Sequence, residues 1–194
     1  VIKFLHNQSL KSVTTARNLI DFNRVFTAFI SISLLIVFNV LFSIYSSPEE
    51  YIFQFNLNDF LILALIAIIF IPVQTSLEEY VFRGYLMQGL GVFFKNKWFP
   101  LFVTSLGFGL LHLSNPEIEK MGNIIIIHYV ITGLFLGIIT LMDDGMELAL
   151  GFHAGNNLLI ALLVTADWTV FQTSSVFKYI GEPDVLNQMF YSLL

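Results

Sequence analysis

Residues 76–85 read SLEEYVFRGY and place two adjacent glutamates and an arginine directly behind an apolar run. Glu79 and Arg83 are four residues apart, a spacing at which an acid and a base can pair on one face of a helix. Glu78 lies about 100° round the helix from Glu79, so we expect it to lack an intrahelical partner. An unpaired carboxylate in such apolar surroundings is a candidate general base.

Two histidines and two asparagines stand inside other apolar segments. His112 follows Phe108 by four residues, and His153 precedes Asn157 by four, with Asn156 beside it. Each of these spacings puts two side chains on one helical face. A carboxylate, two imidazoles and a carboxamide from three helices can abstract a proton from water, hold the hydroxide and stabilise an oxyanion. The residues therefore predict a polar pocket equipped for hydrolysis.

The composition is that of an integral membrane protein. Of the 194 residues, 56% are hydrophobic and 12% are charged, which is roughly half the charged fraction of a soluble domain. The net charge is −5 and the sequence has no basic stripe, so nucleic acid is not an expected partner. The sequence contains no Cys, which excludes disulfides, a thiol nucleophile and a thiolate metal site.

Five apolar segments are predicted to be the helices that carry the polar groups. They are residues 25–45, 60–76, 98–114, 123–142 and 147–164. The expected fold class is all-α: a polytopic transmembrane helical bundle with a polar intramembrane cavity. In the fourth segment, Gly133 and Gly137 form a GxxxG pattern, which is typical of close helix packing. His128, in the same segment, is expected to serve packing or an interhelical hydrogen bond.

We expect a single membrane-embedded domain over residues 1–194, with a motif-bearing core at residues 60–164. The chain begins at Val1 rather than Met, and it stops inside another apolar segment, VLNQMFYSLL, at residues 185–194. For these two reasons it is expected to be part of a longer sequence. Oligomeric state leaves no signal in the sequence.

The distribution of charge predicts the orientation in the membrane. Lysine and arginine gather before the first apolar segment and again at residues 95–97, which places the N-terminus in the cytoplasm. Asp143, Asp144 and Glu147 fall on the same side and do not follow this pattern. The composition is rich in Ile, Phe and Asn and poor in Arg, which indicates a bacterial source and hence the bacterial inner membrane.

Taken together, the motifs resemble those of the CPBP, or Abi, family of intramembrane proteases. This is the CAAX-protease and bacteriocin-processing group that includes the Ras-converting enzyme. The motifs of the family are EExxxR, FxxxH and HxxxN, and here they read EEYVFR at 78–83, FGLLH at 108–112 and HAGNN at 153–157. All three occur in order, each on an apolar segment. The resemblance implies a glutamate-dependent endopeptidase in an all-helical bundle.

The resemblance also implies a role for each motif residue. Glu78 and His112 would activate a water molecule, and His153 and Asn157 would hold the oxyanion of the tetrahedral intermediate. Supporting or substrate-binding positions would be taken by Glu79, Arg83, Phe108 and Asn156. The implied partners are the lipid bilayer and a peptide or protein substrate, either a prenylated CAAX-like peptide or another membrane-associated peptide.

Other functions stay open from the sequence. No metal or cofactor is expected, but two histidines and a glutamate are plausible zinc ligands, so a zinc-dependent membrane protease is the minority alternative even though HExxH is absent. A non-catalytic immunity or scaffolding protein of the same fold is the alternative from another class. A proton-coupled carrier would require inverted repeats or paired broken helices, and the sequence shows neither.

Overall fold

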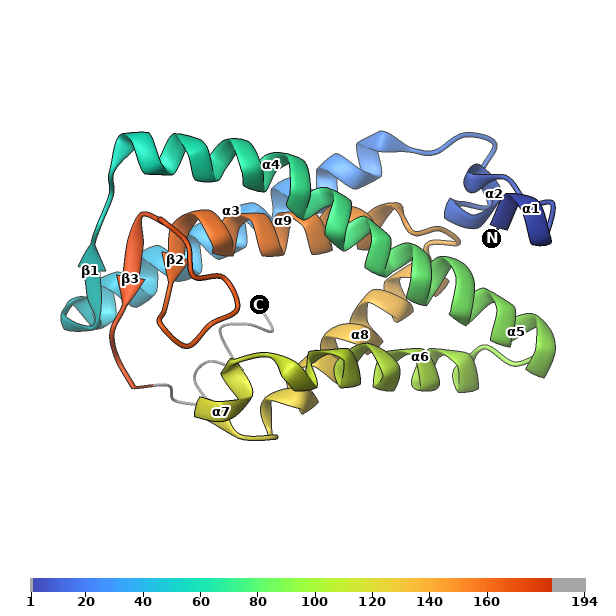
Figure 1. The fold of residues 1–194 in the computed structure, drawn as a ribbon. Coiled ribbons are helices and arrows are strands. Elements are labelled where there is room, and N and C mark those ends of the chain that lie inside the picture. Colours follow the sequence, from blue (N-terminus) through green and yellow to red (C-terminus); the bar gives the residue numbers. More distant parts are fainter. Residues whose placement is uncertain (1, 183–194) are drawn as a thin grey trace.

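A computed structural model shows a helical protein with a small sheet at one end (Figure 1), and the predicted all-α class is confirmed. The structure describes residues 2–182, so the predicted apolar segment at 185–194 lies outside the described residues. The five predicted segments correspond to α3 (Phe22–Ser46), α4 (Leu57–Glu79), α6 (Trp98–Leu111), α8 (Ile125–Met142) and α9 (Glu147–Leu163).

Shorter elements connect these helices. They are α1 (Ile2–Leu5), α2 (Leu10–Thr14), η1 (Pro48–Glu50), η2 (Tyr80–Met87), α5 (Gln88–Phe94), η3 (His112–Ser114) and α7 (Glu117–Met121). The sheet contains β1 (Tyr51–Phe53), β2 (Val164–Thr165) and β3 (Phe177–Tyr179), in the order β1-β3-β2. Strand β3 runs antiparallel to β1 and parallel to β2. The sheet therefore ties the α3–α4 connection to the segment that follows α9.

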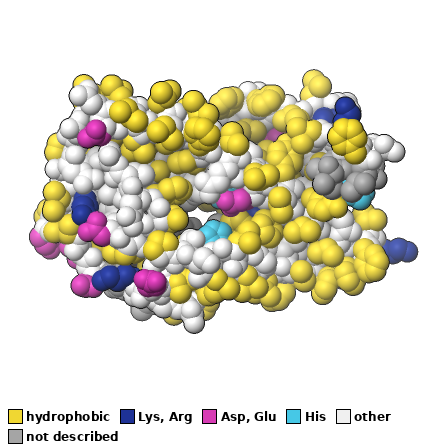
Figure 2. All heavy atoms as spheres, viewed as in Figure 1, with side chains coloured by type: hydrophobic (Ala, Val, Ile, Leu, Met, Phe, Trp, Pro, Cys, Tyr) yellow, Lys and Arg dark blue, Asp and Glu magenta, His cyan; other side chains and the backbone are white. Residues whose placement is uncertain are grey.

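Within residues 2–182, three helical stretches are long and apolar enough to cross a membrane: Phe22–Ser46, Leu57–Phe94 and Ile125–Met142. Figure 2 shows apolar side chains over most of the visible face, while many of the charged side chains gather toward its two ends. Large side chains such as Phe38 and Leu65 are exposed on these helices. A surface of this kind suits lipid as the surrounding solvent.

Helix α9, which carries the third motif, packs against both α3 and α4. Gly151 and Gly155 stand where the backbone of α3 comes closest. A Cβ atom at Gly151 would collide with the carbonyl oxygen of Val25, and one at Gly155 would lie 2.9 Å from the carbonyl oxygen of Phe29. These two glycines therefore allow α9 to lie directly on the backbone of α3.

Helices α6 and α8 form a second packed pair. The predicted close-packing role of the GxxxG pattern on α8 is confirmed by its neighbours. A Cβ atom at Gly133 would lie 3.1 Å from the backbone of Ser105, and one at Gly137 would collide with the side chain of Leu101. The second motif, at the end of α6, is thereby held against the middle of the bundle.

The helix that carries the first motif is irregular on both sides of its two glutamates. Pro72 lies inside α4 and cannot donate a backbone hydrogen bond to the preceding turn. After Glu79 the chain continues as a π-helix, η2, before it returns to α-helical geometry in α5. Such π-helical turns are rare and frequently occur at functional sites.

Candidate active site

Glu79 and Arg83 form a buried ion pair behind the site. Arg83 Nη1 donates to Glu79 Oε1 at 3.0 Å, and Nη2 donates to the carbonyl oxygen of Gly133 at 2.8 Å. The glutamate side chain is 0% exposed and the arginine side chain 1%. The guanidinium also lies over the ring of Phe108, 4.7 Å from its centroid. The pair therefore connects the motif helix to α6 and α8 inside the bundle.

His153 bridges the two adjacent glutamates. Its Nδ1 lies 2.8 Å from Glu79 Oε1, and because an ionised carboxylate only accepts hydrogen bonds, this nitrogen carries a proton. Its Nε2 lies 3.7 Å from Glu78 Oε2. Glu79 thus fixes the orientation of the imidazole, and the opposite ring nitrogen lies close enough to Glu78 for one water molecule to contact both.

Glu78 is more open than its neighbour, with a side chain that is 23% exposed. Its Oε1 accepts a hydrogen bond from Gln74 Nε2 at 3.1 Å. The prediction that Glu78 has no intrahelical partner is therefore wrong, because Gln74 stands four residues earlier on the same helix face. That spacing was visible in the sequence and could have identified the contact. Gln74 donates a hydrogen bond without adding positive charge.

His112 is held in a defined orientation where α6 ends and η3 begins. Its Nδ1 lies 2.9 Å from the carbonyl oxygen of Phe108, so Nδ1 donates, and in the neutral ring Nε2 carries the lone pair. The imidazole stacks on Tyr129 of α8, with ring centroids 4.0 Å apart. Asn115 donates to the Tyr129 hydroxyl at 3.2 Å. The sequence carried no signal for the part played by Tyr129.

The two asparagines of the third motif contact one another. Asn156 Nδ2 donates to Asn157 Oδ1 at 3.1 Å, and both side chains are partly buried. Because its oxygen is engaged, Asn157 presents its own amide hydrogens as donors. Asn156 thereby orients Asn157, and the amide group of Asn157 is suited to bind a developing negative charge.

These groups meet at one cavity of about 830 Å³, a size typical of ligand-binding sites. The predicted site residues that line it are Glu78, Phe108, His112, His153, Asn156 and Asn157. Glu79 and Arg83 are outside this lining and lie behind it. Figure 2 shows a hollow near the middle of the visible face, with acidic and histidine side chains beside it.

The cavity is also lined by polar residues that the sequence did not identify as part of the site. They include Gln74, Glu117, Tyr129 and Thr132. His128 lines it as well and is buried, so the expected role in packing or an interhelical hydrogen bond describes only part of its environment. Thr132 follows His128 by four residues, so both lie on the same face of α8. This spacing was a weak signal that the two residues face the same cavity.

Within the described part of the chain, no group of three or more His, Asp or Glu side chains is arranged to hold a metal ion. A zinc site needs several such ligands that converge at about 2 Å from the ion. The zinc alternative therefore gains no support from the geometry. The expectation that the protein works without a metal stays a prediction for direct metal analysis.

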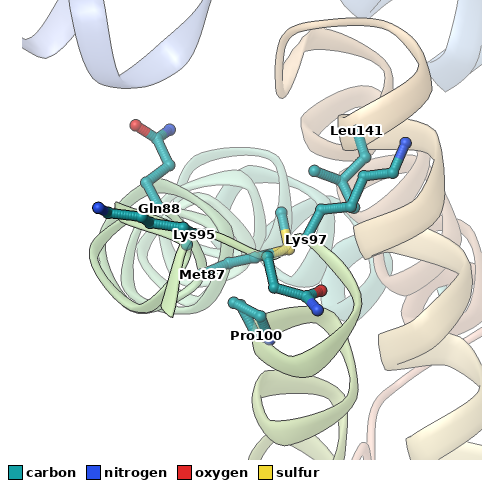
Figure 3. A pocket seen from close by; sticks show the side chains of 8 residues that line it. Met87, Gln88, Lys95, Lys97, Pro100 and Leu141 are labelled. Atoms are coloured by element: carbon teal, nitrogen blue, oxygen red, sulfur yellow. The ribbon is translucent and has the colours of Figure 1, made fainter. Parts of the chain in front are cut away.

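A smaller hollow of about 440 Å³ lies between η2, α5, α6 and α8, near the α5–α6 connection. Figure 3 shows Gln88, Lys95 and Lys97 beside it, with Met87, Pro100 and Leu141. The two lysine side chains extend to opposite sides, Lys97 toward Leu141 and Lys95 away from it. They do not converge on a common point, so this hollow does not present the geometry of an anion site.

Comparison with known proteins identifies the kind of family that the three motifs indicate. Residues 56–159 match the family described as "Type II CAAX prenyl endopeptidase Rce1-like", and this range includes all three motifs. The "Uncharacterized protein YyaK" of Bacillus subtilis (strain 168) is 31% identical over 171 residues, which cover 88% of this chain and 57% of that protein. The chain thus spans little more than half of the length of this curated relative. No solved structure matches the chain.

Proposed function

This chain belongs to the Rce1-like family of type II CAAX prenyl endopeptidases, and we propose that it is an intramembrane endopeptidase that hydrolyses a peptide bond with activated water. The family is a protease family, and the apolar helices make the chain an integral membrane protein. One observation carries the proposal. Glu78 faces Nε2 of His153 at 3.7 Å on the wall of a cavity that His112 and Asn157 also line.

Glu78 and His112 activate the water in this proposal. The proton of the water passes to the Glu78 carboxylate while the hydroxide oxygen bonds to the carbonyl carbon. As the C–N bond breaks, the same proton passes to the leaving nitrogen. Support comes from the hydrogen bond between His112 Nδ1 and Phe108, which leaves Nε2 of the neutral ring as an acceptor able to orient the water.

His153 and Asn157 stabilise the oxyanion of the tetrahedral intermediate. Asn157 contributes its amide hydrogens, since its oxygen already accepts from Asn156. When both ring nitrogens of His153 are protonated, Nδ1 donates to Glu79 and Nε2 donates into the cavity. His153 Nε2 and Glu78 Oε2 lie 3.7 Å apart, so a carbonyl group beside them can meet the donor while the attacking water meets the base.

The proposed substrate is a membrane-associated peptide, which includes prenylated CAAX-like C-termini, and the proposed location is the bacterial inner membrane with the N-terminus in the cytoplasm. The charge distribution supports this orientation. Arg17 donates to the Asp143 carboxylate at 3.0 Å and to Glu147 at 3.4 Å, and Arg24 also pairs with Asp143. Two of the three acids that do not follow the expected pattern, Asp143 and Glu147, are thus paired with the N-terminal arginines.

The experiment compares the peptides of cells that produce the intact protein with those of cells that produce Glu78→Gln or His112→Gln. A set of cleavage products should occur with the intact protein and be absent from both variants. Glu49→Gln is the matched control, because Glu49 is exposed and lies outside the cavity lining. If both variants, inserted at normal levels, yield the same products as the intact protein, the hydrolase is excluded and the non-catalytic immunity or scaffolding function takes its place.

A further inference from the structure

Glu117, the first residue of α7, is one of the residues that line the cavity, and its carboxylate is only half satisfied. Its Oε1 accepts a hydrogen bond from the backbone N–H of Val170 at 2.7 Å. Its Oε2 has no hydrogen-bond partner among the residues that the structure describes, although the residue is only 8% exposed. A buried carboxylate oxygen without a partner costs free energy, and a hydrogen-bond donor or a cation that enters the cavity would satisfy it.

The rest of the cavity lining has the same preference for positive charge. Its glutamates are Glu50, Glu78, Glu117 and Glu182, and between residues 2 and 182 the lining contains no Lys or Arg. Lys178 lies outside the lining and pairs with Asp167 at 2.7 Å. The aromatic rings of Trp168, Tyr129 and Tyr179 also line the cavity, and aromatic faces attract cations.

A chain of contacts connects Glu117 to the reacting groups. Asn115, two residues earlier, donates to the hydroxyl of Tyr129, and Tyr129 stacks on His112. The position of Glu117 is thus fixed relative to His112 through the short η3–α7 connection. A group bound to Glu117 occupies the same cavity as the bond to be cleaved.

We propose that the Glu117 carboxylate binds a lysine or arginine side chain of the substrate, so that the protein selects basic peptides with apolar neighbours. The inference rests on the proposed function, since it names the substrate class of the same cavity. The apolar neighbours are accommodated by side chains such as Ile36, Phe135 and Phe152, which line the cavity between the acidic positions. Glu117 acts in binding and takes no part in the proton transfers.

The test measures peptide binding to the protein in nanodiscs of phosphatidylcholine, in the Glu78→Gln background so that no hydrolysis intervenes. The probes are two fluorescent peptides of 15 residues, one of alternating Leu and Lys and one of alternating Leu and Gln. The Lys peptide should bind about tenfold more tightly, the effect of one hydrogen bond between charged groups. Adding Glu117→Gln should remove most of that preference and leave binding of the Gln peptide unchanged.

Glu119→Gln is the matched control, because Glu119 lies on the same short helix, is exposed and is outside the cavity lining. It should keep the tenfold preference. Gln at position 117 retains an oxygen that accepts from Val170, and the unfolding midpoint of each variant verifies that the fold is intact.

Equal binding of the two peptides to the protein with Glu117 intact would overturn the inference, as would a tenfold preference that survives Glu117→Gln. Either of these binding results can be distinguished from failure of the proposed hydrolase function. The hydrolase fails when the cellular peptides do not depend on Glu78, and the binding measurement uses a form in which Glu78 is already replaced.

Discussion

Glu78 and Glu79 are adjacent in the sequence but have opposite surroundings. Glu79 is 0% exposed and its Oε1 receives both the guanidinium of Arg83 and Nδ1 of His153. Glu78 is 23% exposed and faces the cavity, and among residues 2–182 its one hydrogen-bond donor is the neutral amide of Gln74. One carboxylate is therefore held in a fixed arrangement of opposite charges, while the other remains accessible to a substrate.

The difference shows how a membrane helix can carry two acids for two purposes. The buried acid compensates the arginine and orients the histidine, so its energetic effect is expected in folding. The open acid contributes little to packing, so its effect is expected in chemistry. If this division is right, substitutions around each glutamate should separate into those that change stability and those that change activity.

Removal of the cation beside Glu79 should have the largest effect on stability. Arg83→Met keeps much of the side-chain volume but leaves the buried Glu79 carboxylate without its charge partner. The free energy of unfolding should fall by about 3–5 kcal/mol, measured by denaturant unfolding in detergent. Lys95→Met is the control, because Lys95 is exposed, and it should change stability by less than about 0.5 kcal/mol. Equal stability of the two variants would show that the buried pair is not structural.

Removal of the donor beside Glu78 should have a smaller effect, and on activity instead. Gln74→Leu deletes the 3.1 Å hydrogen bond to Glu78, and the freed carboxylate should lose its orientation. The cleavage rate should fall by about tenfold, because a hydrogen bond to a charged group contributes about 1.5 kcal/mol. Gln172→Leu is the control, because Gln172 is also exposed but lies outside the cavity lining. This substitution should leave the rate unchanged. A loss of stability without a loss of rate would contradict the role assigned to Gln74.

Much of the bundle was predictable because hydrophobic segments and helical spacing are local properties. The five apolar segments became helices, the Glu79–Arg83 spacing produced an ion pair, and Gly133 lies against the backbone of α6 as its GxxxG pattern indicates. The motif residues that line the cavity also followed from their positions on shared helical faces.

Other features depend on contacts between distant residues and left no local pattern. His153 reaches Glu79 across 74 positions of sequence, and Tyr129 meets His112 only because α8 packs against α6. The strands β1 and β3 pair across more than a hundred residues. The hydrogen bond from Val170 to Glu117 spans 53 positions, and no local sequence pattern indicated the π-helical turn η2.

The most direct measurement compares Glu78→Gln with Glu79→Gln, purified side by side and assayed for cleavage of one Glu78-dependent peptide and for the free energy of unfolding. Glu78→Gln should cleave about 10²–10⁴ times more slowly with a stability within about 0.5 kcal/mol of the intact protein, whereas Glu79→Gln should lose about 3–5 kcal/mol of stability. A fully active Glu78→Gln protein, or equal losses of stability in the two variants, would contradict the division between a chemical and a structural glutamate.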